Sequence, residues 1–190
     1  MDVAVKTKDF GVSRAIEFFN KDDIYFGIGK SSEWKASDYD ETETIPSDPE
    51  KQPPLTRETT NLEEVIGYRK VDYMYLVVPH DGSTVPDGTV IINFDTSVQW
   101  RAVSPDMAVE EGARYVYIET TIQPSDFPEG EYRQVGVFSG LTKKDSVPVG
   151  RIVLSPDEVE SQGTLEIIDN RVASPLNEYS KETLKFVIKF

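Results

Sequence analysis

The chain has 190 residues, no cysteine, and 34 acidic against 20 basic residues, which gives a formal net charge of −14. This length predicts roughly one domain, with enough buried surface to fold without disulfides or metals. The absence of cysteine excludes disulfides, thiolate zinc sites and cysteine nucleophiles. A field of this sign repels nucleic acid and anionic lipid, so we expect neither as a direct partner and interpret the charge mainly as a source of solubility.

The N-terminal segment MDVAVKTKDFGVSRAIEFF carries charges throughout and has no apolar block of the length that a secretion signal needs. No run in the sequence approaches the ~20 apolar residues of a membrane-spanning helix. We therefore expect a soluble chain that is made in the cytoplasm and has no membrane partner. Within this segment the sequence predicts a helix over 12–20, with Ser13 as N-cap and with Ile16 and Phe19 facing inward.

The sequence FGIGKSS, residues 26–32, follows the start of a predicted strand over 24–28 and looks at first like a phosphate-binding loop. A Walker loop needs a glycine five positions before its Gly-Lys-Ser, and that position holds Ile24. A dinucleotide fingerprint needs a third glycine at the position of Ser32. No helix is predicted to follow, because an acidic, proline-rich segment begins soon after Trp34. We therefore expect no nucleotide cofactor.

That acidic segment is DYDETETIPSDPEKQPP, residues 38–54, with six acids, one lysine and four prolines. Proline fixes φ and removes a backbone donor, so neither a helix nor a central strand suits this composition. Low hydrophobicity combined with charge predicts an extended loop or arm, which we place at residues 31–60. Structureless segments of this length are uncommon in compact domains and are usually functional or disordered.

Short β-strands dominate the rest of the chain. Alternating apolar positions and β-branched or aromatic residues predict strands at 73–78, 89–94, 114–122, 133–139, 150–154, 164–168 and 184–190. Turn sequences separate them: HDGS at 80–83, VPDG at 85–88, FPEG at 127–130 and SQG at 161–163. This spacing predicts a mainly β, sandwich-like single domain over 1–190, with the arm at 31–60.

Two segments share the signals of a short capped helix. In residues 104–113, Ser104 is placed as the cap, Pro105 at the first helical position, acids in the body, and Gly112 at the end. Residues 155–163 have the same order of cap, proline, acids and glycine. We expect both to form helices of one or two turns.

The sequence contains few candidates for a catalytic or metal centre. The one histidine, His80, lies in a predicted turn, and no Gly-x-Ser-x-Gly elbow exists to supply a serine nucleophile. Neither the HExxH nor the calcium-loop pattern occurs. The sequence does not exclude a glycosidase site with two paired carboxylates, because 34 acids offer many pairs and separation in sequence does not fix distance in space. We expect solvated acids, no catalytic residues, no cofactor and no metal.

Aromatic residues make up 11% of the chain, and tyrosine and tryptophan suit protein interfaces. Trp100 is interpreted as a core residue, whereas Trp34, beside the acidic arm, could lie in the core or at an interface. The alternative function from this observation is a carbohydrate-binding β-sandwich in which Trp34, Trp100 and surface tyrosines stack on sugars.

Two stretches of the sequence together resemble a known family. The first is IYFGIGKSSEW, residues 24–34, in which a strand runs into glycine, a basic residue, serine and then tryptophan, before acids and prolines. The second is 163–190, with Gly163, the triplet Asp169-Asn170-Arg171, Glu182 and a final strand ending in Phe190. Both are similar to motifs of the baseplate wedge subunit of contractile-tailed bacteriophages, the family of the T-even gene product eight.

The middle segments GARYVYIETTI and EYRQVGVFSGL are similar to shorter members of this group. Two departures stand out: Lys30 replaces the usual arginine, and Tyr179-Ser180 replace a common Asp-Gln pair. The chain is also much shorter than the T-even protein, so it is expected to lack a large inserted domain.

The resemblance implies a structural virion protein of the tail baseplate, not an enzyme. Its partners would be other wedge proteins, which it would bridge, and it would form a homodimer and take part in the rearrangement that triggers sheath contraction. The arm would add contact area by ordering on a neighbour. The residues expected to serve as interface or motif positions are Phe26, Gly29, Lys30, Ser31, Trp34, Asn170, Arg171 and Phe190.

Overall fold

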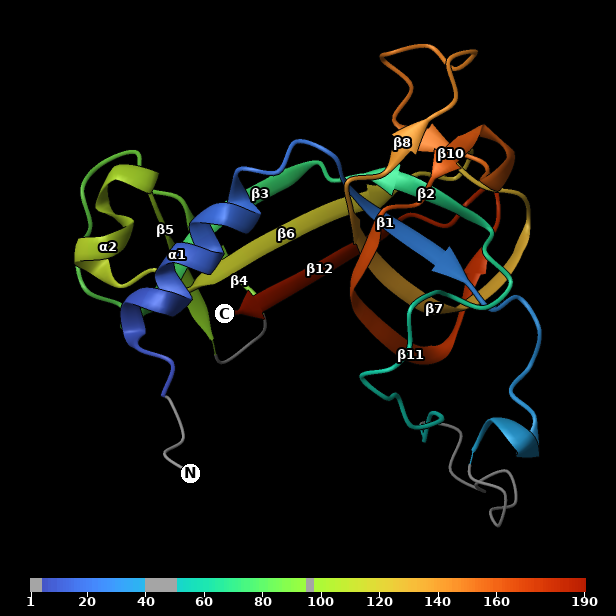
Figure 1. Ribbon diagram of the computed structural model, residues 1–190, viewed down its shortest axis with the longest axis horizontal. Coiled ribbons are helices and arrows are strands. Elements are labelled where there is room, and N and C mark those ends of the chain that lie inside the picture. The colour runs from blue at the N-terminus through green and yellow to red at the C-terminus, as the bar shows by residue number, and fades with distance from the viewer. Residues whose placement is uncertain (1–4, 40–50, 95–97) are drawn as a thin grey trace. The chain divides into compact units, whose positions relative to one another are not determined.

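The computed structural model describes residues 5–39, 51–94 and 98–190 (Figure 1). Its helices are α1 (Lys8–Phe19) and α2 (Ala108–Glu111), with 3-10 turns at Ala36–Asp38, Pro105–Met107 and Pro156–Glu158. Its strands are β1 (Ile24–Gly29), β2 (Gly67–Lys70), β3 (Tyr73–His80), β4 (Ile91–Asn93), β5 (Gln99–Val103), β6 (Tyr115–Ile122), β7 (Gly130–Ser139), β8 (Thr142–Lys143), β9 (Val153–Leu154), β10 (Val159–Ser161), β11 (Thr164–Leu176) and β12 (Glu182–Lys189). The predicted mainly β class with short helices is confirmed. In the described residues, no helix combines the length and apolarity needed to cross a bilayer.

The chain divides into two compact units, each built on a five-stranded antiparallel sheet. The first unit comprises Met1–Lys21, Asp72–Thr120 and Thr183–Phe190, and the second comprises Asp22–Val71 and Thr121–Glu182. The single domain over 1–190 stays a prediction.

The first unit holds the sheet β12-β6-β3-β5-β4 together with both helices. Helix α1 contacts β3, and its buried Phe18 packs on Phe190 with ring centroids 5.4 Å apart. The helix begins at Lys8, earlier than predicted, because Thr7 and not Ser13 is the N-cap: its hydroxyl accepts a hydrogen bond from the Phe10 N–H. Trp100 is buried in the core, as predicted, in a cluster with Val77, Ile92 and Tyr117.

The predicted helical segment 104–113 is confirmed in outline. A 3-10 turn that starts at Pro105 leads into α2, and Gly112 ends the helix in the left-handed conformation with φ +68°. Glycine adopts this conformation without the strain that a side chain would cause, which explains why a glycine follows the last residue of the helix. Ser104 occupies the cap position, but its side chain makes no capping hydrogen bond.

The second unit holds the sheet β11-β7-β1-β2-β9 and the small sheet β10-β8. Strand β1 is buried along its whole length and pairs on both sides, with β2 and β7. A continuous apolar run such as IYFGIG suits a central strand of this kind. The strand packs in a core that contains Tyr25, Leu62, Tyr68, Phe138 and Leu154.

The predicted helix over 155–163 is wrong beyond its first turn. Ser155 and Glu158 form a capping box around a single 3-10 turn, after which Val159 adopts an extended backbone. Val159 then pairs with Lys143 in the β10-β8 sheet, so strand pairing outcompetes the helix signals in the sequence.

The described ends of the predicted arm, 31–39 and 51–60, contain no strand and one 3-10 turn at Ala36–Asp38. Two of their residues are nevertheless buried, Tyr39 and Pro53. The Tyr39 hydroxyl donates to the Lys51 carbonyl oxygen at 3.2 Å, which ties the two ends together. The prediction for residues 40–50 lies outside the described residues.

Candidate interaction site at the root of the arm

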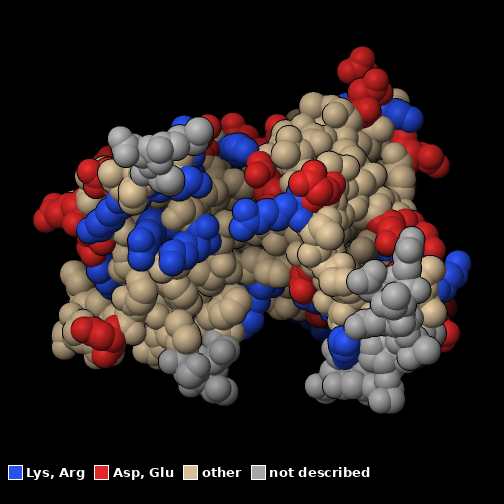
Figure 2. Space-filling model, turned by 60° about the horizontal axis from the view of Figure 1, so that its bottom comes forward, with Lys and Arg blue, Asp and Glu red and all other residues tan. Residues whose placement is uncertain are grey.

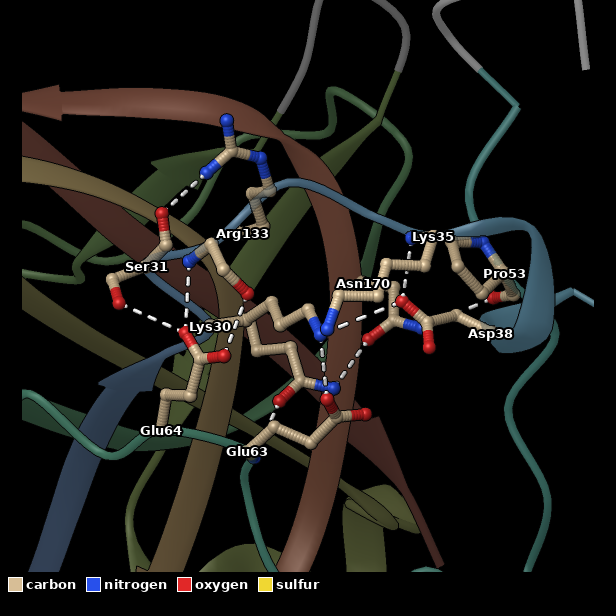
Figure 3. A network of polar contacts seen from close by, with 11 residues as sticks. Lys30, Ser31, Lys35, Asp38, Pro53, Glu63, Glu64, Arg133 and Asn170 are labelled. Atoms are coloured by element: carbon tan, nitrogen blue, oxygen red, sulfur yellow. Dashed lines mark hydrogen bonds and ion pairs between the residues drawn. The ribbon is translucent and has the colours of Figure 1, made fainter. Parts of the chain in front are cut away.

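A network of polar contacts in the second unit fixes the two ends of the arm (Figure 3). We call this network the arm root. Its members are Lys30, Ser31, Ser32, Trp34, Asp38, Pro53, Glu63, Glu64, Arg133, Gln134 and Asn170. They come from the segment that follows β1, from the returning segment that leads to β2, and from the strands β7 and β11. Segments far apart in the sequence therefore meet where the arm leaves and rejoins the sheet.

Gly29 and Lys30 hold the start of the arm against the loop that contains Glu63. A Cβ on Gly29 would lie 2.4 Å from the carbonyl oxygen of Glu63, so only glycine lets the two segments approach this closely. That oxygen accepts a hydrogen bond from the Lys30 N–H at 2.7 Å. Lys30 itself has φ +59°, a conformation that costs an L-residue about 1–2 kcal/mol. The contacts of its side chain must therefore offset this strain.

The Lys30 side chain is buried, and Lys30 is the one lysine among the arm-root residues named above. Its Nζ lies 2.7 Å from a Glu63 carboxylate oxygen, 3.5 Å from an Asp38 oxygen and 5.0 Å from the centre of the Trp34 ring. Burial alone would lower the pKa of Lys30, but the hydrogen bond to Glu63 and the charges of Glu63 and Asp38 outweigh it and raise that pKa. The ammonium thus stays charged while it holds both the loop and the arm.

We expect Lys30→Ala to lower the free energy of unfolding by about 2 kcal/mol, because the carboxylates and the indole lose their common cation. Lys30→Gly should be about 1 kcal/mol less damaging, since glycine relieves the strain of the positive φ. Urea unfolding of both variants measures the difference. Equal stabilities for the two variants would show that the backbone of Lys30 stores no strain.

Ser31 and Ser32 bind Glu64, the second glutamate of the loop. One Glu64 oxygen accepts from the Ser31 hydroxyl and the Ser32 N–H, both at 2.8 Å, and the other accepts from the Ser32 hydroxyl at 2.6 Å. The hydrogen bonds from Ser32, then those from Ser31, lower the pKa of Glu64 to about 2. The two serines therefore tie the start of the arm to the loop before β2.

This lowered pKa predicts a pH-dependent stability. Because the folded carboxyl has a pKa below its ordinary value of 4.5, its contribution is present above about pH 4.5 and is lost as the pH falls towards about 2. Glu64 is exposed, so screening limits the effect to about 1 kcal/mol or less. Urea unfolding of Glu64→Gln should show a deficit at pH 6 that shrinks by pH 3. The exposed Glu33→Gln serves as the control, and an unchanged deficit at pH 3 would contradict the assignment.

Asn170 and Gln134 fix the returning end of the arm. The Glu63 N–H donates to the Gln134 side-chain oxygen at 2.7 Å, and Gln134 in turn donates to the Asn170 side-chain oxygen at 2.9 Å. Asn170 then donates to the Pro53 carbonyl oxygen at 3.0 Å. Asn170 lies within β11 and holds the returning end of the arm through its side chain.

Arg171 forms a second cluster on the same strand. Its guanidinium lies 3.0 Å from an Asp169 oxygen and 3.2 Å from a Glu182 oxygen, and Glu182 also accepts from the Tyr132 hydroxyl. Burial, followed by the hydrogen bond to Glu182, raises the pKa of Tyr132. Asp169, Arg171 and Glu182 of the C-terminal motif are thus brought together, and Arg171 clamps the two carboxylates.

The remaining motif residues, Phe26, Trp34 and Phe190, pack against other side chains of the protein. Phe26 is a core residue of β1, and Phe190 lies in the first unit against Phe18. The ring of Trp34 carries the Lys30 ammonium, and Trp100 is buried, so neither indole is a free platform for a sugar. That these motif residues form an interface stays a prediction.

Sequence reasoning missed the residues that complete the arm root, chiefly Glu63, Glu64, Arg133 and Gln134. Arg133 donates to the Ser31 carbonyl oxygen at 2.8 Å and pairs with Glu131 at 2.7 Å. The only signal for Glu63 and Glu64 is their place, two adjacent acids before a strand. Among the described residues no group of histidine, aspartate and glutamate side chains could hold a metal ion. The acids of the arm root instead bind cations and hydroxyls of the chain itself.

Two comparisons with known proteins decide the family. The family model described as "Baseplate wedge 3 tail fiber network component" matches residues 3–190. The chain belongs to this family. A relative named virion protein 3, of Enterococcus phage phiEF24C, is 30% identical over 173 residues, which cover 89% of this chain and 85% of that protein.

The baseplate wedge family confirms the broad interpretation of the sequence motifs. The protein is a structural component of a phage baseplate, and membership in the family implies association with other baseplate proteins rather than enzymatic work. The closer kinship to the T-even gene product eight stays a prediction.

Proposed function

We propose that this wedge protein bridges neighbouring wedge proteins and moves with them in the rearrangement that triggers sheath contraction. Such a part works by rigid-body repositioning across its interfaces, so its contacts must be held at fixed points of a stiff scaffold. The observation that supports the proposal is the arm root. There the outgoing and returning ends of an acidic arm are both fastened to a central β-sheet.

The arm root lowers the entropic cost of binding a partner with the arm. Flexible segments that fold on binding lose conformational freedom at that moment, which weakens the complex. Here Tyr39 and Lys51 are already joined, and Pro53 is already held by Asn170. These held ends therefore lose little further conformational freedom when a partner binds, while the sheet supplies a firm base.

Labelled virions and co-purification test the proposed role. A gold label on this protein should appear at the tail tip in micrographs, and the purified chain should co-purify with other wedge proteins. A label on the capsid, or none on the particle, would refute the proposal. Binding of the isolated chain to a glycan array without co-purification would favour the carbohydrate-binding alternative.

The arm should also differ between the free and the assembled protein. We expect proteases to cut the isolated chain quickly within residues 38–54, and the same sites to be protected in the assembled particle. Limited proteolysis followed by mass spectrometry compares the two states. An arm that resists cutting in the isolated protein would show that it is already folded against its own chain.

A further inference from the structure

The first unit carries an open hollow whose lining is cationic, although the whole chain is strongly acidic. Its volume is about 570 Å³. Its lining residues are Lys8, Val78, Pro79, Arg101, Glu111, Gly112, Arg114 and Tyr115. Among these charged residues, Glu111 is the one acid against three bases. Figure 2 shows lysine and arginine side chains gathered over the first unit.

Two of the three bases are left to face the hollow. Glu111 forms a two-pronged ion pair with Arg101, so its charge is neutralised within the lining. The Lys8 side chain lies over Gly112, where a Cβ would meet its Cε at 2.1 Å, so the glycine makes room for it. No carboxylate within ion-pair distance of Lys8 or Arg114 is found among the described residues. The hollow therefore presents a net positive charge.

An aromatic wall completes the hollow. The Arg114 guanidinium lies 5.6 Å and the Lys189 ammonium 6.0 Å from the centre of the Tyr115 ring. Trp100 packs against the same ring at 4.9 Å, which holds it in place from the core. Arginine and lysine recognise carboxylates, and a fixed tyrosine ring beside Pro79 offers apolar contact. This combination suits a short peptide that carries both acids and apolar or proline residues.

The acidic arm of the protein has this chemistry. Residues 40–50, DETETIPSDPE, contain five acids, two prolines and no base. The residues that flank this segment, Tyr39 and Lys51, are joined by a hydrogen bond from the Tyr39 hydroxyl to the Lys51 carbonyl oxygen. The charges of the two units are also unequal. The first unit has 11 acidic and 8 basic residues, whereas the second unit, which bears the arm, has 23 acidic and 12 basic residues.

We propose that the cationic hollow of one copy binds residues 40–50 of a second copy, with Lys8 and Arg114 receiving the carboxylates. This inference rests on the proposed bridging function and names one of the contacts that would perform it. The pairing joins the less acidic unit of one molecule to the most acidic segment of the other. It is short-range, because salt screens exposed charges beyond ~8 Å at physiological ionic strength.

Self-association of the full chain tests this contact. We expect sedimentation velocity to show a concentration-dependent dimer that weakens as salt is raised. Lys8→Ala with Arg114→Ala, and separately the amide variant of the arm, should each weaken association by about tenfold or more, since each removes one side of the charge pairing. The amide variant is Asp40→Asn, Glu41→Gln, Glu43→Gln, Asp48→Asn and Glu50→Gln.

Matched controls separate the contact from net charge. Lys144→Ala with Lys181→Ala removes two exposed lysines of the second unit and should leave association unchanged. For the arm, the control converts five exposed acids of the second unit to amides, namely Glu129, Asp145, Asp157, Glu160 and Glu178. Circular dichroism and urea unfolding establish that each variant is folded.

The decisive experiment mixes two variants. We call Lys8→Ala with Arg114→Ala the hollow variant, and the amide variant of residues 40–50 the arm variant. Each molecule of the hollow variant still has an acidic arm, and each molecule of the arm variant still has a hollow, so the mixture should form heterodimers. A synthetic peptide of residues 40–50 should also bind the arm variant but not the hollow variant. A wild-type chain that stays monomeric at about 100 µM, or a mixture that does not associate, would overturn the proposal. Co-purification of the same chain with other wedge proteins would show that the proposed bridging function survives that failure.

Discussion

Gly29→Ala should lower the free energy of unfolding by about 3 kcal/mol, which corresponds to a fall in Tm of about 6–12 °C for a chain of this size. The added Cβ would lie 2.4 Å from the Glu63 carbonyl oxygen and 3.2 Å from the Leu62 Cβ. The oxygen has little freedom to move away, because it accepts the Lys30 N–H at 2.7 Å. The loop and strand must therefore separate, and the contacts that fasten the arm are lost with them.

Gly150→Ala is the matched control for this substitution. Gly150 lies in the same unit and is exposed. Apart from its own chain neighbours, no heavy atom of the described residues lies within 4 Å of the position that a Cβ would take there. A methyl group there should change stability by no more than about 0.5 kcal/mol. Thermal unfolding followed by circular dichroism compares the two variants. If Gly29→Ala had the same Tm as the wild type, the close approach of β1 and the Glu63 loop would not be a constraint on the fold.

The strands that could be predicted are those whose own residues carry the pattern. Strands β1, β6 and β7 show apolar runs or alternation that are complete within a few residues, so no distant contact is needed to find them. Strands β2 and β5 were missed because each contains an arginine, Arg69 or Arg101, at a position that is buried or partly buried. Each arginine is paired with an acid elsewhere in the chain, Asp126 or Glu111. The sequence pattern cannot show such a partner.

The arm root illustrates the same limit for the candidate site. Gly29, Lys30, Ser31 and Asn170 could be singled out from the motifs that they form. Their joining into one network could not be predicted, because it depends on Glu63 and Glu64. These glutamates lie 32 or 33 residues after the lysine and serines that they bind. Local sequence signals single out individual residues, whereas tertiary pairing decides which of them bind one another.

Arg69→Ala should have the largest effect, a loss of about 3–5 kcal/mol in the free energy of unfolding. The Arg69 guanidinium lies 2.8 Å from an Asp126 oxygen, with the two side chains 8% and 10% exposed. That same oxygen also accepts the Gln123 N–H at 2.7 Å, so Asp126 organises the loop after β6. Removing the arginine leaves a buried carboxylate without its cation, and such a charge costs more than the lost contact itself.

A double-mutant cycle separates the pair from its surroundings. Arg69→Ala combined with Asp126→Ala should cost clearly less than the sum of the single changes, because the second substitution removes the stranded charge. The exposed pair Arg14 and Glu17, with side chains 52% and 60% exposed, should give a coupling of at most about 0.5 kcal/mol in the same measurement. Strict additivity for Arg69 and Asp126 would mean that they do not act as a pair. Strong coupling would show that a buried ionic contact stabilises the second unit, which the proposed movement with neighbouring proteins would require.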